Sequence, residues 1–318
     1  VIPPVPMQEV DCDVIILGAG PAGLAAAIYA ARARMDVVVI DQSVPGGQAA
    51  STYHIANYPG TPGVVTGRNL VDNMRMQADM FGAHIEDLKE VMKVEFVGKV
   101  KTVVTEDTTY RGKVAIVATG SMPRTLPAEG ADEFKGRGVH YCATCDGAMY
   151  QDRRVIVVGG GSSAMEEAVF LTRFASEVVI VHRSEKFRAA QVEIDMAKAN
   201  PKIKFITNTI VKKVHGQGHG IGSVELEDVN TGEVRDFPID GIFVYIGNEP
   251  MTDMCSEEIE LDDDRYIVAG EDCKTNIAGV YVAGDIRSKP IRQVVTATAD
   301  GAVAGIMSER YIRSLNGV

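Results

Sequence analysis

Two cysteines with two residues between them stand near the middle of the chain, and an acidic residue follows them at once. The stretch is Tyr141-Cys142-Ala143-Thr144-Cys145-Asp146-Gly147. Thiols at this spacing can close a small disulfide ring, and a carboxylate beside them can carry a proton. By itself the Cys-x-x-Cys pattern fits a redox pair, half of a zinc site or two buried small side chains. If Cys145 begins a helix, its sulfur lies near backbone N–H groups that favour the thiolate.

A glycine-rich turn between two apolar segments precedes the cysteines. Residues 14–17 and 37–40 are typical of strands buried on both faces, and the alanine-rich residues 24–34 are typical of a helix. The turn after the first strand has the G-x-G-x-x-G pattern, which binds the pyrophosphate of a dinucleotide at a helix N-terminus. An acid after the second strand stands where a carboxylate binds a ribose hydroxyl. These residues are Gly18, Gly20, Gly23 and Asp41.

The same arrangement recurs after the cysteines. Residues 155–158 and 178–181 are predicted strands, and the turn between them is Gly159-Gly160-Gly161-Ser162-Ser163-Ala164. Alanine is small enough for close contact of helix and strand at the third position. The second strand ends without an acid, and Arg183, Lys186 and Arg188 follow it. Arginine binds phosphate through two hydrogen bonds, so the first turn suits FAD or NAD and the second suits NADPH. The alternative for this basic cluster is a solvated loop.

Composition narrows the class of protein. The 318 residues carry a net charge of −11, so a nucleic-acid partner is not expected. Five cysteines in so long a chain do not make a disulfide scaffold, and an odd number fits a reducing, cytoplasmic environment. The uncharged residues 14–31 are interrupted by three glycines and a proline, so no membrane span is predicted. Without a second cysteine pair, no metal site is expected.

Further apolar patterns predict the rest of the fold. An amphipathic helix is expected over residues 69–81, and strands are expected near 91–97, 100–105 and 108–118. Two apolar segments that end in glycine, 114–120 and 242–247, mark where the chain leaves and re-enters its first domain. A strand over 280–285 ends in an acid, and a long helix of small residues follows from Arg292 to Arg310.

Taken together, these motifs resemble one known family. The chain is similar to the low-molecular-weight thioredoxin reductases of the bacterial and archaeal type over nearly its whole length. Cysteines with these neighbours, placed between two nucleotide folds, are a specific pattern. The matching stretches are Gly18–Gly23, Gly46–Gln48, Cys142–Gly147, Gly159–Ala168, Ala283–Asp285 and Arg292–Gln293.

The resemblance implies an α/β fold with two Rossmann-like dinucleotide-binding domains of three layers (β/β/α), one inserted in the other. The FAD-binding domain would comprise residues 1–120 and 248–318, and the NADPH-binding domain, which carries the cysteines, would comprise residues 121–247. The protein would be a cytoplasmic homodimer that passes electrons from NADPH through FAD to the Cys142–Cys145 disulfide, and then to thioredoxin or a thioredoxin-like protein.

The resemblance also implies roles for individual residues. Cys145 would be the thiol beside the flavin, Cys142 the thiol that attacks the partner's disulfide, and Asp146 the acid and base. The expected FAD-binding residues are Gly18, Gly20, Pro21, Ala22, Gly23, Asp41, Gln42, Gly47, Gln48, Asn57, Thr119, Gly120, Gly284, Asp285, Arg292, Gln293 and Val294. The expected NADPH-binding residues are Gly159, Gly161, Ser162, Ser163, Ala164, His182, Arg183, Ser184, Lys186 and Arg188.

The sequence departs from the family pattern at one position. The family's NADPH loop has a second arginine where this chain has Ser184. Loss of one bidentate contact costs about 1.5–3 kcal/mol, or roughly ten- to a hundred-fold in affinity. NADH or reduced ferredoxin therefore remains an alternative donor, and a peroxiredoxin-linked reductase remains an alternative function. A flavin-binding sensor without turnover is a further alternative, although a sensor need not keep both thiols and the acid.

Overall fold

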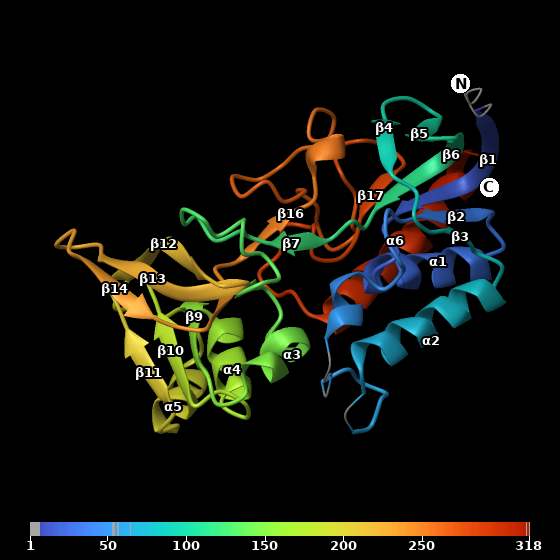
Figure 1. Ribbon diagram of the computed structural model, residues 1–318. Helices are drawn as coiled ribbons and strands as arrows, with labels where there is room; N and C mark the ends of the chain where they lie inside the picture. The colour runs from blue at the N-terminus through green and yellow to red at the C-terminus, as the bar shows by residue number, and fades with distance from the viewer. Residues whose placement is uncertain (1–6, 53–54, 56, 64, 316, 318) are drawn as a thin grey trace. The chain divides into compact units, whose positions relative to one another are not determined.

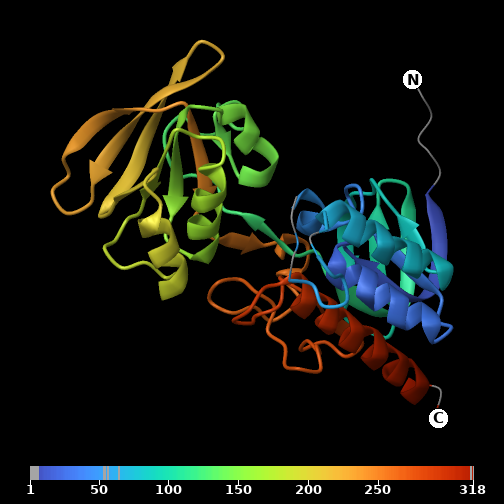
Figure 2. The same ribbon diagram turned by 90° about the horizontal axis from the view of Figure 1, so that it is seen from below.

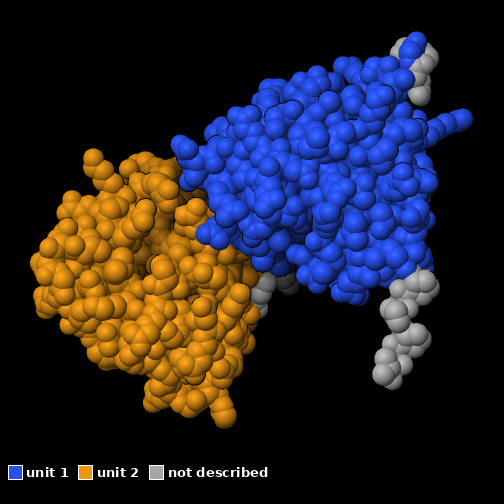
Figure 3. Space-filling model, turned by 90° about the horizontal axis from the view of Figure 1, so that it is seen from above, with its two compact units in different colours: residues 1–122, 249–318 blue, residues 123–248 orange. Residues whose placement is uncertain are grey.

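The computed structural model (Figure 1) describes residues 7–52, 55, 57–63, 65–315 and 317, apart from the side chain of Cys145. The sequence predicts a flexible leader over residues 1–7, and this segment lies outside the described part of the chain except for Met7. The chain forms two compact units, coloured separately in Figure 3. Unit 1 comprises Val1–Met122 and Glu249–Val318, and unit 2 comprises Pro123–Asn248. Each unit contains a sheet with parallel strands and helices packed on it, so the predicted α/β class with two dinucleotide-binding folds is confirmed.

The sheet of unit 1 is parallel at one side and antiparallel at the other. Its order is β3 (His84–Glu86), β2 (Val37–Ile40), β1 (Gln8–Leu17), β6 (Thr108–Val117), β5 (Lys101–Thr105) and β4 (Val91–Glu95). The last three strands form an antiparallel meander, while β17 (Val280–Val282) pairs in parallel with the end of β6. The first strand begins six residues earlier than predicted. Its polar first half, which lacks the apolar signal, pairs with β6 from Gln8 onward.

Two helices from opposite ends of the chain pack side by side in unit 1 (Figures 1 and 2). These helices are α1 (Pro21–Arg32) and α6 (Val294–Leu315), and α2 (Gly67–Met80) packs on the other side of α1. A Cβ atom added to Gly301 would lie 2.1 Å from the carbonyl oxygen of Ala22. The backbones of α1 and α6 therefore meet in direct contact, which only very small residues allow. The last helix begins two residues later than predicted, so Arg292 and Gln293 belong to the loop before it.

Unit 2 has three layers. A parallel sheet has the order β11 (Ile203–Ile206), β10 (Glu177–Val181), β9 (Arg154–Gly159), β15 (Gly241–Tyr245) and β8 (Val139–His140). One face carries α4 (Ser162–Leu171) and α5 (Gln191–Ala199), and the other carries the antiparallel strands β12 (Thr209–Gln217), β13 (Gly220–Asp228) and β14 (Val234–Pro238). Alternate residues of β9 point to opposite faces of the parallel sheet. Val155 and Val157 pack under the helices, while Ile156 and Val158 face the antiparallel strands.

Short elements complete the chain. The two crossings between the units form a two-stranded sheet of β7 (Ser121–Pro123) and β16 (Asn248–Pro250). The cysteine stretch forms α3 (Ala143–Asp146) and the 3-10 turn η2 (Gly147–Tyr150), while η1 (Gly47–Ser51) and η3 (Asp253–Cys255) belong to unit 1.

Candidate active site

The predicted FAD-binding residues gather at one edge of the sheet in unit 1. Strands β1, β2, β6 and β17 run parallel, so their carboxyl ends meet at the same edge, where α/β folds bind ligands. The glycine turn follows β1, Asp41 and Gln42 follow β2, Thr119 and Gly120 follow β6, and Gly284 and Asp285 follow β17. The loop of Gly47 lies on the same turn, since a Cβ atom there would be 3.2 Å from Cα of Gly20.

The first glycine turn has the geometry that an anion site requires. Gly18 has a φ of +101°, and a Cβ atom on it would lie 2.4 Å from the carbonyl oxygen of Ala118. A Cβ atom on Gly23 would lie 1.8 Å from the carbonyl oxygen of Gly18, so helix and strand are in contact. Helix α1 begins at Pro21 without a side-chain cap on its first amides. These amides are therefore free to bind a pyrophosphate.

Asp41 makes contacts within the protein that the sequence did not indicate. Its Oδ2 accepts a hydrogen bond of 2.6 Å from the backbone N–H of Ala19, and its Oδ1 accepts from N–H and Oγ of Ser43 at 2.8 and 2.9 Å. The carboxylate therefore ties the end of β2 to the glycine turn. Its contact with a ribose hydroxyl stays a prediction.

Asp285 has a buried oxygen that lacks a partner. Among the described residues, none forms a hydrogen bond with its Oδ1. Burial raises the pKa of this carboxyl group, while Lys289 and Arg292 act in the opposite direction. A buried acceptor of this kind needs a hydrogen-bond donor, and a hydroxyl group of a flavin side chain would supply one. The residues present therefore fit the FAD that the sequence predicts.

Other predicted FAD-binding side chains meet through hydrogen bonds. Nδ2 of Asn57 donates to Oε1 of Gln293 at 3.1 Å, and Nε2 of Gln48 donates to the carbonyl oxygen of Ser121. Nε of Arg292 donates to the carbonyl oxygen of Asp285 at 3.3 Å. Segments far apart in the sequence are thus joined at the same edge of the sheet.

A buried ionic cluster behind Asp285 was not predicted. Oδ2 of Asp300 accepts from the backbone N–H of Gly284 at 3.1 Å and from Nζ of Lys289 at 2.8 Å. Arg287 donates to both oxygens of the same carboxylate at 3.1 and 3.0 Å. The side chains of Arg287 and Asp300 are 8% and 9% exposed. Asp300 thus holds the loop after β17 in place, and only its position inside a helix of small residues could have suggested this.

The second glycine turn, in unit 2, resembles the first. Gly159 has a φ of +154°, and a Cβ atom on it would lie 2.3 Å from the carbonyl oxygen of Tyr245. Gly161 precedes α4, which has no side-chain cap, and a Cβ atom there would meet no atom within 4 Å. Ser162 and Ser163 are exposed beside this open space, and Ala164 is buried against the sheet. The free amides of α4 fit a second pyrophosphate.

The loop after β10 folds back on this turn. Backbone N–H groups of Arg188 and Ala189 donate to the carbonyl oxygen of Gly160 at 2.7 and 3.2 Å. The imidazole of His182 packs against Gly160, where a Cβ atom would lie 2.4 Å from the ring, and stacks on Phe187. Burial lowers the pKa of His182, and Arg188 and Arg183 lower it further. The neutral imidazole therefore supports the loop, and its predicted contact with NADPH remains untested.

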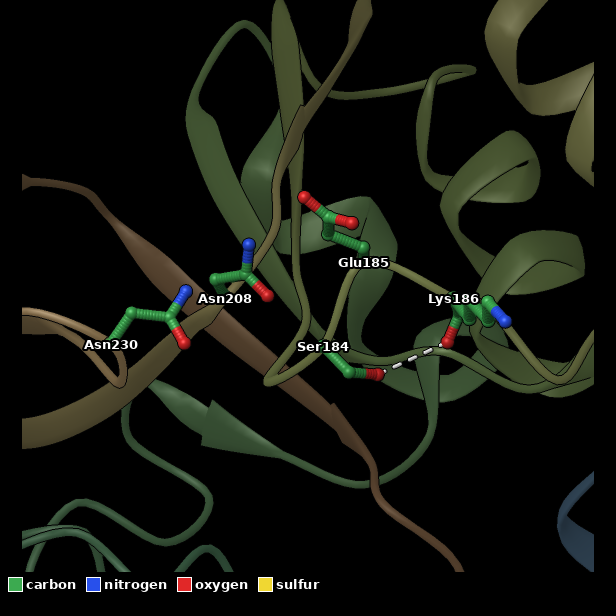
Figure 4. A pocket seen from close by; sticks show the side chains of 5 residues that line it. All are labelled: Ser184, Glu185, Lys186, Asn208 and Asn230. Carbon is green, nitrogen blue, oxygen red and sulfur yellow. Dashed lines mark hydrogen bonds between the residues drawn. The ribbon is translucent and has the colours of Figure 1, made fainter.

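A hollow of about 580 Å³ opens beside this loop. Figure 4 shows the side chains that line it, namely Ser184, Glu185, Lys186, Asn208 and Asn230. Oγ of Ser184 donates to the carbonyl oxygen of Lys186 at 3.1 Å, the bond drawn in Figure 4. Glu185 brings a negative charge next to Lys186, which opposes binding of a phosphate there. Sequence reasoning missed both asparagines, because they lie outside the dinucleotide motif.

The cysteine stretch follows the carboxyl end of β8. Cys142 is disulfide-bonded, and its Sγ lies 3.3 Å from Oγ1 of Thr144. The side chain of Cys145 lies outside the described part of the structure. Helix α3 begins at Ala143 and not at Cys145, because the N–H of Asp146 donates to the carbonyl oxygen of Cys142 at 3.1 Å and closes a single turn there. The condition under which backbone N–H groups would favour the Cys145 thiolate, a helix that begins at Cys145, is therefore not met.

Two tyrosines and a histidine surround this turn, and none was predicted. The hydroxyl of Tyr245, at the end of β15, accepts from the N–H of Ala143 at 2.8 Å. Nδ1 of His140 lies 2.9 Å from Oδ2 of Asp146, and its Nε2 lies 2.6 Å from the hydroxyl of Tyr150. His140 stands two residues before Cys142, but a single histidine next to a motif gives no signal of its own.

Comparison with known proteins agrees with this arrangement. A model of the family described as "Pyridine nucleotide-disulphide oxidoreductase" matches residues 12–301. The chain belongs to this family. It is 44% identical to a thioredoxin reductase of Listeria innocua, over 97% of this chain and 96% of the relative.

Solved structures of the family give the same result. A thioredoxin reductase of Lactococcus lactis in the FR conformation superposes with a TM-score of 0.89 at 38% identity, covering 95% of this chain and 99% of the other. The thioredoxin reductase of T. acidophilum gives a TM-score of 0.86 at 32% identity, with 96% and 99% covered. The resemblance predicted from the sequence is thus confirmed. The roles of individual residues and the domain boundaries stay predictions.

Three further cysteines lie where burial disfavours their thiolate forms. Cys12, Cys255 and Cys273 are free thiols, and burial raises the pKa of each to about 12. A thiol that stays protonated is a poor nucleophile.

Among the described residues, no three histidine, cysteine or acidic side chains group as metal ligands would. Within the same part of the chain, none of the helices combines the length and apolar character needed to cross a bilayer.

Glu167 of α4 makes the stability of unit 2 depend on pH. Burial, and to a lesser degree Glu166, raises the pKa of its carboxyl group from 4.5 to about 7. The folded protein therefore binds this proton more tightly than the unfolded chain does, so the stabilisation is complete below pH 4.5 and is lost as the pH rises through 7. We expect the free energy of unfolding to fall by about 1–3 kcal/mol over this range relative to Glu167→Gln. Urea unfolding of both proteins at several pH values measures the difference, and parallel curves would contradict it.

Proposed function

We propose that this chain is a thioredoxin-disulfide reductase that takes electrons from NADPH through FAD. The observation that carries the proposal is the position of Cys142, at the carboxyl end of β8 in the same parallel sheet as the second glycine turn. Unit 1 supplies a separate glycine turn and a buried Asp285 oxygen suited to a flavin. The activity of the similar proteins supports the same function.

When bound, NADPH and FAD would supply two electrons to the Cys142–Cys145 disulfide. Cys142, half-buried before α3, would then attack the disulfide of the partner protein. The Asp146 carboxylate, 32% exposed one turn after Cys142, would take up and return the thiol proton. The amides of α1 and α4 would hold the two pyrophosphates.

The two units would rotate relative to each other during turnover. The second glycine turn and the cysteines both belong to unit 2, whereas the predicted flavin residues belong to unit 1. Nicotinamide and disulfide cannot occupy the same face of the flavin, so they would reach it in turn. The paired crossings β7 and β16 would form the hinge. We further propose a cytoplasmic homodimer.

Anaerobic reduction of the flavin tests the proposal. Purified protein should show flavin absorbance that bleaches on mixing with NADPH, and it should then reduce thioredoxin. NADH and reduced ferredoxin, used in parallel, test the alternative donors. A protein that binds flavin but reduces no thioredoxin with any of the three donors would contradict the proposed function.

Preference between NADPH and NADH should respond to the residue at position 184. An arginine introduced by Ser184→Arg adds a bidentate phosphate contact next to Lys186 in the hollow of unit 2. We expect the KM for NADPH to fall about tenfold, with little change for NADH. Ser184→Gln is the control, since it adds length without charge. If Ser184→Arg and Ser184→Gln changed the KM for NADPH equally, the 2′-phosphate would not bind here. The same would follow if Ser184→Arg changed the KM for NADPH and the KM for NADH equally.

A further inference from the structure

A buried histidine joins the acid of the cysteine stretch to a buried tyrosine. His140 is the last residue of β8, and its side chain is 1% exposed. Its Nδ1 lies 2.9 Å from Oδ2 of Asp146, and its Nε2 lies 2.6 Å from the hydroxyl of Tyr150. Imidazole, carboxylate and phenol thus form a continuous row within unit 2.

Aromatic packing fixes the orientation of this row. The His140 ring stacks on Phe243 of β15, with centroids 5.3 Å apart and planes at 26°. The Tyr150 ring meets both of these rings edge-on at 5.4 Å. A Cβ atom on Gly241 would lie 2.3 Å from the Tyr150 ring, so the phenol has no space to move on that side. The two nitrogens of His140 therefore face Asp146 and Tyr150 in a set geometry.

The short distance between His140 and Asp146 requires a proton. Two atoms that both carry lone pairs repel each other at 2.9 Å, so one of them must carry a hydrogen for this contact to be favourable. Burial raises the pKa of Tyr150 to about 12, with Asp146 and Asp240 adding to the effect, so the phenol keeps its proton. A neutral phenol can donate to Nε2, which leaves the imidazole hydrogen on Nδ1, facing the carboxylate.

We propose that His140 is a positioning residue for Asp146. Its Nδ1–H, held in place by Tyr150 and Phe243, turns Oδ2 of the carboxylate toward the protein interior and leaves Oδ1 for the thiols. The contact in the disulfide form is close but not aligned as a hydrogen bond, and a small rotation of the partly exposed Asp146 would align it. In the dithiol form, the carboxylate accepts one thiol proton as the thiolate attacks, and returns that proton to the leaving thiolate. His140 donates throughout and exchanges no electrons.

Other titratable groups face the same site. Asp146 raises the pKa of Tyr150 in η2 and contributes to the raised pKa of Tyr245 in β15. Glu167 of α4 acts on Tyr245 as well, and Asp240 acts on Tyr150. Phe243, which packs on the imidazole, carries no charge. Removing His140 leaves all of these groups in place, so a change in the pH profile would report on the histidine.

This proposal rests on the acid and base role of Asp146 in the proposed function, and three variants test it. His140→Phe keeps a ring on Phe243 but removes both nitrogens. The double variant His140→Phe/Tyr150→Phe also avoids leaving a buried phenol without a partner. His140→Asn places an amide N–H near the position of Nδ1 and should restore part of the lost activity.

The holoenzyme with FAD provides the first measurement. We expect flavin reduction by NADPH to stay within about twofold of the wild type in all variants, because none of these residues belongs to the predicted nucleotide sites. For both phenylalanine variants, the kcat with thioredoxin should fall roughly tenfold or more, while the KM for thioredoxin should not change. The acid limb of the pH profile should move to higher pH. A double variant that matches the wild type in kcat and pH profile, at equal FAD content, would overturn the proposal.

Nuclear magnetic resonance of ¹⁵N-labelled histidines gives a second measurement that needs no turnover. The resonances lost in His140→Phe identify those of His140. We expect its Nδ1 to carry the proton, and its shift to change when dithiothreitol reduces the disulfide of the holoenzyme. An Nδ1 without a proton in both forms would exclude the positioning role. Because no thioredoxin is present, this result stands even if the proposed function fails.

Discussion

Replacing Cys142 by serine should abolish reduction of thioredoxin while flavin reduction by NADPH continues. Serine has nearly the same size, but its hydroxyl is a far weaker nucleophile than a thiolate and cannot form the disulfide that Cys142 makes. We expect turnover to fall on the order of 10³-fold or more. Stopped-flow absorbance of the flavin band after mixing with NADPH follows the first half of the reaction, and a thioredoxin-coupled assay follows the whole.

Two controls make this result specific. Cys12→Ser removes a thiol whose pKa burial raises to about 12, and it should leave both measurements unchanged. Equal FAD content in all proteins shows that unit 1 is intact. If Cys142→Ser stopped flavin reduction as well, with FAD bound, the assigned roles of Cys142 and of the second glycine turn would be wrong.

Replacing Asp300 by alanine should destabilise unit 1 more than any surface change. The variant leaves the side chains of Arg287 and Lys289, 8% and 5% exposed, without their shared carboxylate. Breaking a buried ion pair by removing one partner costs about 3–5 kcal/mol, because the remaining charge is uncompensated. The backbone N–H of Gly284 also loses its acceptor, so the loop that presents Asp285 should loosen. Urea unfolding gives the stability, and titration with FAD gives its affinity.

Asp253→Ala is the matched control for this prediction. Asp253 also pairs with an arginine, Arg265, at 2.6 Å, but its side chain is 91% exposed. Exposed ion pairs contribute little to stability, so the unfolding midpoint should not move. If Asp300→Ala and Asp253→Ala lowered the stability by equally small amounts, the buried cluster would contribute no more to stability than an exposed ion pair.

The cysteine stretch and both glycine turns could be predicted from the sequence because each depends on local spacing. Gly18 and Gly159 could be predicted, since a fixed strand, turn and helix pattern surrounds them. His140, Tyr150 and Asp300 could not, since their roles depend on contacts made only when separate strands and helices pack together. The start of α3 at Ala143 could not be predicted for a related reason. One backbone hydrogen bond from Asp146 to Cys142 decides it, and no pattern of side chains predicts such a bond.

The tight contact of α1 with α6 affects the order in which the protein can fold during synthesis. Residues 123–248 leave the ribosome as one continuous segment and can fold as soon as they emerge. The first 122 residues must wait, because the helix that covers Ala22 and Ala26 is translated only after residues 123–248. We therefore expect unit 2 to be folded in the nascent chain while unit 1 is still incomplete, until α6 has been translated.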